Sequence, residues 1–185
     1  MTARGRYSLV QRLLHWLIAL LAIPALGVGM TLGWLGFEGA RDSLGIGITN
    51  ALYSGHKTVG VLILLLMTLR LVLRLTLGSP PPVPTLTPFE RFASRAVQGL
   101  LYLVLMALPV VGWLATAAGG YPVQFFVWKL PGLIAKDPAL SEALFELHGA
   151  LGAAFLALLA LHIAGALRHW LIKRDEVMRR MSLFR

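Results

Sequence analysis

Two histidines lie fourteen residues apart in the most apolar stretch of the chain, His148 and His162 between Leu147 and Ile172. Fourteen residues make about four turns of an α-helix, so both imidazoles would leave the same face, roughly 21 Å apart along the axis. That distance is most of a hydrocarbon core about 30 Å thick. One helix would therefore offer a metal ligand near each surface of a membrane. His169 shares this face, but it lies at the end of the stretch, where we interpret it as an interfacial histidine and as the substitute ligand if His162 is not one.

The two remaining histidines match these depths. His15 lies near the start of the first apolar stretch, and we expect His56 and His148 each to lie in the first turn of a helix that follows a loop. The sequence thus predicts two pairs, His15 with His162 and His56 with His148. Two facing imidazoles from different helices can be the axial ligands of a six-coordinate haem iron in a bundle core. Glycines near three of them could open space for a flat macrocycle, although glycine also serves helix packing; these are Gly60, Gly149, Gly152 and Gly165.

The elements that must hold these histidines are predicted from composition. Of 185 residues 57% are hydrophobic, against about 45–50% in a soluble domain, which indicates an integral membrane protein. Four stretches are long enough to span a bilayer: 13–35, 52–75, 92–118 and 147–172. Their short connections predict one all-α, up-down four-helix bundle over residues 1–185, with loops at Gly36 to Gly55 and Gly119 to Glu146.

The basic residues that give the net charge of +9 are distributed in a pattern that indicates how the spans are oriented in the membrane. Four basic residues lie in the two connections just named, together with five acidic ones. The other thirteen flank the opposite ends of the spans: Arg4, Arg6, Arg12, Arg70, Arg74, Arg91, Arg95, Arg168, Lys173, Arg174, Arg179, Arg180 and Arg185. The positive-inside rule then predicts that both termini are cytoplasmic. The same residues suit anionic lipid headgroups, and their position beside spans argues against nucleic-acid binding.

Two features of the sequence each have two possible interpretations. Arg70 and Arg74 follow His56 on one face of the second span, and they could be snorkelling anchors at the cytoplasmic end or could pair with an anionic group of a cofactor. The aromatic-rich segment 121–134 could lie at headgroup level or form a lid over a ligand at the periplasmic face.

The sequence lacks the residues that several other kinds of site or function require. There is no cysteine, which excludes disulfides, cysteine-ligated iron–sulfur clusters and covalently attached c-type haem. A di-iron or zinc site in a bundle needs ligands at one depth, and a proton or cation transporter normally carries a carboxylate within its spans; the spans hold no acidic residue. No serine nucleophile elbow, phosphate loop or dinucleotide fingerprint is present.

These residues, in this order, resemble the bacterial cytochrome b561 family of small four-helix membrane proteins with two b haems. The resemblance covers essentially the whole chain, through RLLHW in the first span, HKTVG and LRLVLRL in the second, and LHG with LALLALH in the fourth. The ligand histidines of that family fall on His15, His56, His148 and His162.

The resemblance implies a bacterial inner-membrane oxidoreductase that exchanges electrons with ubiquinone, and some members are similar to superoxide oxidases. Superoxide is then the expected donor at the periplasmic face, where Lys57, Lys129 and Lys136 are the available cations. The alternative is a cytochrome b anchor subunit that links a hydrogenase or dehydrogenase partner to quinone; the short loops offer such a partner little surface. A third alternative, a membrane scaffold without haem, would give a colourless protein.

Overall fold

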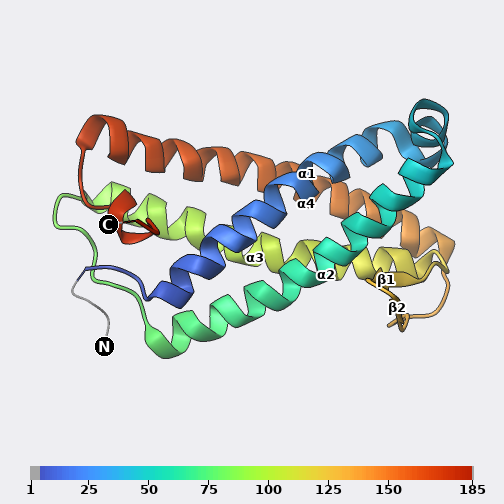
Figure 1. The fold of residues 1–185 in the computed structure, drawn as a ribbon, viewed down its shortest axis with the longest axis horizontal. Helices are drawn as coiled ribbons and strands as arrows, with labels where there is room; N and C mark the ends of the chain where they lie inside the picture. The colour runs from blue at the N-terminus through green and yellow to red at the C-terminus, as the bar shows by residue number, and fades with distance from the viewer. Residues whose placement is uncertain (1–4, 185) are drawn as a thin grey trace.

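Four long helices make up almost the whole protein in the computed structural model, which describes residues 5–184: α1 (Leu9–Leu44), α2 (Ile46–Leu77), α3 (Pro88–Ala118) and α4 (Pro138–Leu167) (Figure 1). Arg4 and Arg185, counted above among the basic residues, lie outside the described range. Each helix is long and apolar enough to cross a membrane. The predictions of an all-α fold and of a multi-pass membrane protein are therefore confirmed.

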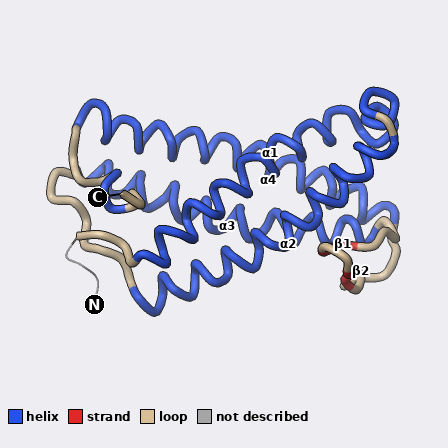
Figure 2. The backbone as a smooth tube through the Cα atoms, in the orientation of Figure 1, coloured by secondary structure: helices blue, strands red, loops and turns tan. Residues whose placement is uncertain are grey.

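The helices pack in chain order, α1 against α2, α2 against α3, and α3 against α4, while α1 and α4 meet over a shorter length (Figure 2). A core in the middle of the bundle joins all four of them. Its buried side chains are Ile18, Ala22, Ile63, Met67, Val104 and Phe155. The two halves of the bundle on either side of this core are where the histidines lie.

Polar caps start three of these helices before the apolar stretches begin. Ser8 and Gln11 form a capping box at the start of α1, Thr87 and Glu90 form another at the start of α3, and the Asp137 side chain accepts a hydrogen bond from the Leu140 N–H at the start of α4. Such caps satisfy N–H groups that have no partner in the first turn. The expected spans begin later than these helices because hydropathy marks the hydrocarbon-facing part of a helix and not its capped end.

The predicted loop from Gly36 to Gly55 is wrong, because that segment is helical apart from two glycine breaks. Gly36 (φ 65°, ψ 179°) interrupts α1, and Gly45 (φ 80°, ψ 155°) separates α1 from α2. Both positive φ values are accessible mainly to glycine. As a result His56 lies about three turns inside α2. His148 also lies about three turns inside its helix, because α4 begins at Pro138, so neither histidine is in the first turn expected for it.

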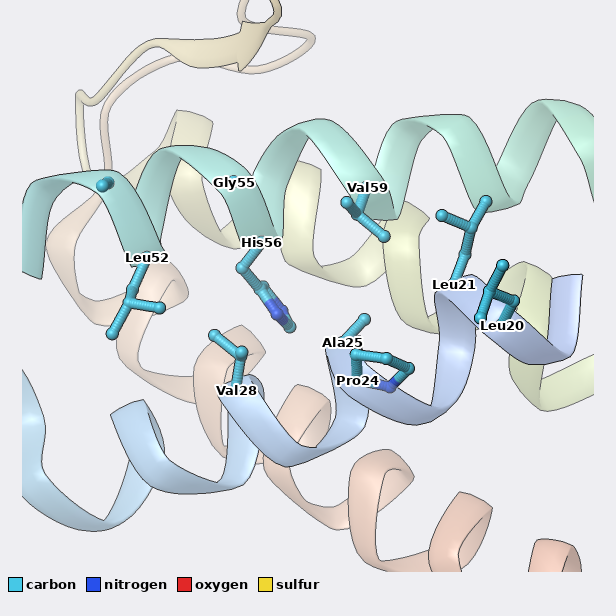
Figure 3. Close-up of a pocket in the computed structure, with 10 residues that line it drawn as sticks. Leu20, Leu21, Pro24, Ala25, Val28, Leu52, Gly55, His56 and Val59 are labelled. Atoms are coloured by element: carbon cyan, nitrogen blue, oxygen red, sulfur yellow. The ribbon is translucent and has the colours of Figure 1, made fainter. Parts of the chain in front are cut away.

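A β-hairpin, which the sequence did not predict, follows α3: β1 (Val123–Phe125) pairs antiparallel with β2 (Trp128–Leu130). Gln124 ties it to α2, since its side chain accepts a hydrogen bond from Ser54 Oγ at 2.6 Å and its carbonyl accepts one from Thr58 at 3.4 Å. Ser54 and Thr58 lie two residues on either side of His56, so they leave the opposite face of α2, and Figure 3 shows the hairpin on the side of α2 away from that imidazole. The hairpin braces the back of α2 and does not cover His56 as a lid.

Both described ends of the chain lie at the end of the bundle that also carries the linker between α2 and α3 (Figure 1). Side chains of α1 bind the C-terminal segment there, where Arg12 donates to the Ser182 carbonyl at 2.7 Å and Trp16 donates to the Met181 carbonyl at 2.8 Å. That C-terminal segment includes the π-helix η1 (Arg168–Lys173) and the 3₁₀-helix η2 (Met178–Arg180).

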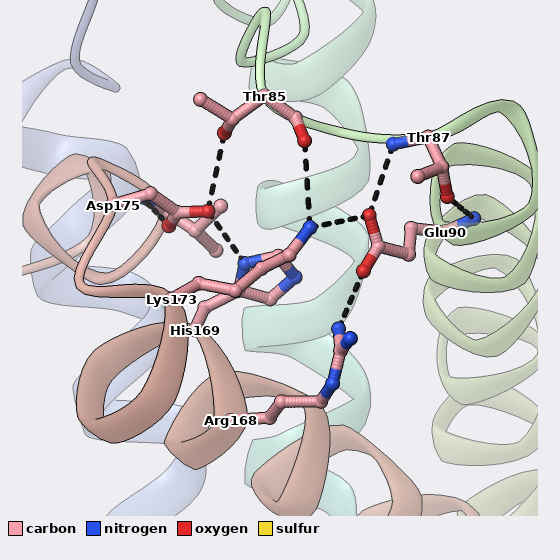
Figure 4. Close-up of polar contacts among 8 residues, drawn as sticks. Thr85, Thr87, Glu90, Arg168, His169, Lys173 and Asp175 are labelled. Atoms are coloured by element: carbon pink, nitrogen blue, oxygen red, sulfur yellow. Dashed lines mark hydrogen bonds and ion pairs between the residues drawn. The ribbon is translucent and has the colours of Figure 1, made fainter.

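A polar network fastens η1 to the start of α3 (Figure 4). Glu90 accepts hydrogen bonds from Arg168 and from Lys173 Nζ, the latter at 2.6 Å. Asp175 bonds His169 Nδ1 at 2.7 Å and accepts from Thr85 Oγ1 at 3.2 Å. His169 is therefore engaged by a carboxylate and not by a second imidazole.

Candidate functional site: two histidine pairs

The first pair lies near the end of the bundle that carries the chain termini. His15 on α1 and His162 on α4 have ring centres 6.1 Å apart, with ring planes at 71°. Because α1 and α4 are antiparallel, a histidine early in one and late in the other come to the same depth. The structure brings together the two residues that the sequence assigned to this pair.

The second pair joins α2 and α4 at the opposite end. His56 and His148 also have ring centres 6.1 Å apart, with planes at 83°. The Nδ1 of His148 lies 3.0 Å from the Leu108 carbonyl, to which it donates when that nitrogen is protonated, leaving Nε2 free. The ring of His56 is buried and lies against the Ala25 carbonyl of α1, although its Nδ1 makes no hydrogen bond of good geometry with the described residues.

This geometry fits an axially ligated metal. Two imidazoles that hold one metal from opposite sides place a metal–nitrogen bond of about 2 Å on each side, so their ring centres lie roughly 6 Å apart. No group of three or more His, Cys, Asp or Glu within residues 5–184 could hold a metal ion. A haem suits such a pair because its macrocycle supplies the four equatorial nitrogens and needs only two axial ligands from the protein.

Two glycines on other helices make room for the second pair. A Cβ at Gly29 of α1 would lie 2.8 Å from His56 Cε1, and a Cβ at Gly112 of α3 would lie 2.9 Å from His148 Cε1. Both distances are shorter than a carbon–carbon contact allows, so any side chain there would displace an imidazole. Sequence reasoning missed both residues.

The glycines that the sequence did single out have looser surroundings. A Cβ at Gly149, Gly152 or Gly165 would meet no atom within 4 Å, and one at Gly60 would meet only Pro109, at 4.0 Å. Open space beside α4 is compatible with a flat ligand, but these positions do not contact the histidines. Gly29 carried a readable signal, because it follows His15 by fourteen residues, the same spacing that places His148 and His162 on one face.

Arg70 and Arg74 point toward the start of α1. Arg70 donates to the Gln11 carbonyl at 2.9 Å and lies 5.8 Å from the centre of the Tyr102 ring, and Arg74 donates to the Tyr7 hydroxyl at 3.2 Å. Neither forms a salt bridge with a carboxylate of the described residues. Both are thus turned toward α1, and the positive charge of Arg70 acts on His15 and His162.

A membrane bundle of four helices with two facing histidine pairs is the architecture of a b-type membrane cytochrome. The chain belongs to the prokaryotic cytochrome b561 family, whose model matches residues 6–182. The family implies haem b as the cofactor.

Relatives of known name align over nearly the whole chain. Cytochrome b561 homolog 2 of Escherichia coli is 28% identical over 95% of this chain and 90% of that protein. The probable superoxide oxidase CybB of Yersinia pestis is 29% identical over 95% of both chains. Cytochrome b562 of Cereibacter sphaeroides is 28% identical over 98% of both chains.

Proposed function

We propose that this protein is a di-haem b cytochrome that carries electrons from superoxide, at the periplasmic face of the inner membrane, to ubiquinone. The observation that carries the proposal is the presence of two histidine pairs of equal separation, 6.1 Å in each, at opposite ends of the bundle. In this assignment His15 and His162 hold one haem, and His56 and His148 hold the other. Haem b supplies reversible one-electron transfer, at a potential set by its axial ligands, its burial and nearby charge.

The residues around each pair have distinct tasks. The Leu108 carbonyl would orient His148 by accepting its Nδ1–H, since a partner on the outer nitrogen fixes the tautomer of a ligating histidine. Arg70 and Arg74 would neutralise the carboxylates of the haem near the termini, because an arginine at membrane depth prefers an anionic partner. Their lack of a carboxylate partner within the described chain supports this role.

The basic residues set the orientation that we propose. They gather at the end of the bundle with both termini, so that end is assigned to the cytoplasm by the positive-inside rule. His56 and His148 then lie on the periplasmic side. Lys57 follows His56 and donates to the Pro122 carbonyl, and Lys129 and Lys136 lie in the same connection between α3 and α4 as Pro122, so the three cations lie at this end of the bundle and would attract the superoxide anion.

The overall reaction balances with two superoxide ions for each quinone. Each superoxide gives up one electron and leaves as O₂, and one ubiquinone takes two electrons and two protons to become ubiquinol. The likeness to a protein named probable superoxide oxidase, at 29% identity, supports superoxide as the donor.

The test begins with the haem-to-protein ratio and the reduced-minus-oxidised optical spectrum of the detergent-purified protein. We expect two b-type haems per chain; one haem would overturn one of the ligand pairs, and a colourless protein would overturn the proposal. The purified cytochrome should then form ubiquinol when superoxide is generated beside it. Ubiquinol formation that requires a co-purified hydrogenase or dehydrogenase subunit would instead identify an anchor subunit.

A further inference from the structure

Two arginines near the N-terminus, Arg6 and Arg12, donate hydrogen bonds to the same oxygen atom, the Ser182 carbonyl, at 2.6 and 2.7 Å. Arg6 also donates to the Phe184 carbonyl at 2.9 Å. The two guanidinium nitrogens that share the Ser182 oxygen therefore lie within about 5 Å of each other. Two positive charges at this separation repel each other, and a backbone carbonyl carries no net charge that would offset the repulsion.

No carboxylate of the described residues forms a salt bridge with either arginine. The acidic residues at this end of the bundle are bound by other cations: Glu90 by Lys173, Asp175 by His169 and Glu176 by Arg179. Each guanidinium has five N–H donors, but the hydrogen bonds of Arg6 and Arg12 to described residues use one terminal nitrogen of each. The pair therefore has both uncompensated charge and unused donors.

The arginine pair lies at the depth of lipid headgroups. Trp16 follows Arg12 by about one turn on the same face of α1, is 42% exposed, and donates to the Met181 carbonyl beside Ser182. Tryptophan is enriched at the boundary between hydrocarbon and headgroups, and one helical turn places the Arg12 backbone about 5 Å farther from the membrane centre. Phe184, whose carbonyl accepts from Arg6, is 83% exposed. Exposed aromatic side chains beside the two charges suit a lipid better than a water-soluble anion.

We propose that Arg6 and Arg12 form a binding site for the phosphate of an anionic phospholipid, such as phosphatidylglycerol, from the leaflet at this end of the bundle. The forked donors of two arginines match the oxygens of a phosphate group, and the negative charge of the phosphate offsets the repulsion between them. The acyl chains lie along α1, where Leu13 and Leu17 are exposed. The bound lipid holds residues 181–184 against α1. Neither histidine pair takes part, so the site is independent of the proposed function.

Neutral substitutions test the site. Arg6→Gln and Arg12→Gln each keep an N–H donor but remove the charge and the fork, and using both means that the test does not depend on one variant folding. Arg95→Gln is the matched control, because Arg95 is an exposed arginine near the start of α3 and forms no salt bridge within the described chain. The measurement is the rise in thermal unfolding temperature of the detergent-purified holoprotein on addition of phosphatidylglycerol, with native mass spectrometry to titrate the bound lipid. Phosphatidylethanolamine, which has no net charge, and inorganic phosphate are the comparison ligands.

We expect phosphatidylglycerol to stabilise the wild-type protein more than either comparison ligand does. One arginine near an anionic headgroup changes affinity by about fivefold, so Arg6→Gln and Arg12→Gln should each bind phosphatidylglycerol about fivefold more weakly, and Arg95→Gln should bind it unchanged. Variants that are less stable without lipid but gain as much from phosphatidylglycerol as the wild type would reveal a structural role alone and overturn the site.

Equal protection by inorganic phosphate would assign the pair to a free anion and would also overturn the lipid site. Loss of a haem or a changed haem spectrum in both variants would overturn it as well, because the arginines would then serve the haem near His15. The haem count of the unmodified protein tests the proposed function separately, so the two can fail independently.

Discussion

The two ends of the bundle hold histidine pairs of the same separation in very different surroundings. His15 and His162 lie at the end where both termini, the linker and η1 are joined by charged side chains, and Arg70 is close enough for its charge to act on both rings. His56 and His148 lie between glycines, with backbone carbonyls beside both rings and an apolar cavity next to His56. Charged side chains therefore dominate the surroundings of the first pair, and close packing around the rings dominates those of the second.

This difference has a consequence for electron transfer. In the proposed assignment both haems have the same two imidazole ligands, so any difference between their potentials must come from burial, nearby charge and ligand hydrogen bonds. A cation beside a haem favours its reduced form. We expect the haem at the charged end to have the higher midpoint potential, which would let it draw electrons from the haem held by His56 and His148.

The largest effect should come from removing a ligand. His56→Ala or His148→Ala should remove the haem of the glycine-lined end, and His15→Ala or His162→Ala should remove the haem of the charged end, so that each variant keeps one haem of the two. The measurement is the haem-to-protein ratio with the reduced-minus-oxidised spectrum, which also separates the spectra of the two ends. His169→Ala is the control and should keep both haems, because that ring is bound to Asp175. A ligand variant that retains two haems would refute its assignment.

Crowding an imidazole of the His56–His148 pair should weaken haem binding at that end of the bundle alone. Gly29→Ala and Gly112→Ala place a methyl group 2.8 and 2.9 Å from the rings of His56 and His148. Changes around metal ligands typically weaken binding by about 10- to 100-fold, so we expect partial loss of the haem held by this pair and an altered spectrum of what remains. Haem titration of the purified variants measures this loss.

The control for this pair of variants is Gly33→Ala, since a Cβ at Gly33 meets no atom within 4 Å. It should titrate like the unmodified protein. Equal haem loss in Gly33→Ala would mean that the effect comes from helix flexibility and not from the contact with histidine.

The sequence could predict the parts of the structure that follow from periodicity. Four apolar stretches gave four helices, and a fourteen-residue spacing placed two histidines on one face of α4. The depth of His15 and His56 was enough to match each to its partner, because antiparallel helices convert position along the chain into depth in the membrane.

What the sequence could not predict depends on contacts between helices or on capping. The segment from Gly36 to Gly55 looked like a loop because of its glycines, but only Gly36 and Gly45 break the helices there. The contact of Gly112 with His148 joins α3 to α4, and the hairpin is held by side chains of α2; neither leaves a periodic signal. The role of Arg70 and Arg74 stays a prediction, supported by their inward contacts.

The charged end can be probed through Arg70. Arg70→Gln keeps a hydrogen-bond donor near the Gln11 carbonyl but removes the positive charge. We expect the midpoint potential of the haem at this end to fall by on the order of tens of millivolts, since one charge at protein distances is worth about this much, with little change at the other end. Redox titration followed optically measures both values. Arg95→Gln removes an exposed charge and is the control; a fall of equal size at both ends would contradict a local effect.

The smallest effect concerns the network that fastens the C-terminal segment to this end. Burial alone would raise the pKa of Asp175, but hydrogen bonds from the Val177 N–H and from His169 outweigh it and hold the pKa below its usual value. A carboxylate with a lowered pKa stabilises the folded state above its ordinary pKa, and this contribution is lost as the pH falls through the folded-state value. Acidification into that range should therefore loosen residues 174–184, raising their hydrogen exchange by roughly one order of magnitude or less beyond the intrinsic pH effect. Asp175→Asn should exchange faster already at neutral pH and lose this acid response. The β1–β2 hairpin at the opposite end of the bundle has no part in the network and serves as the internal reference. An acid response that persists in Asp175→Asn would assign it to another group.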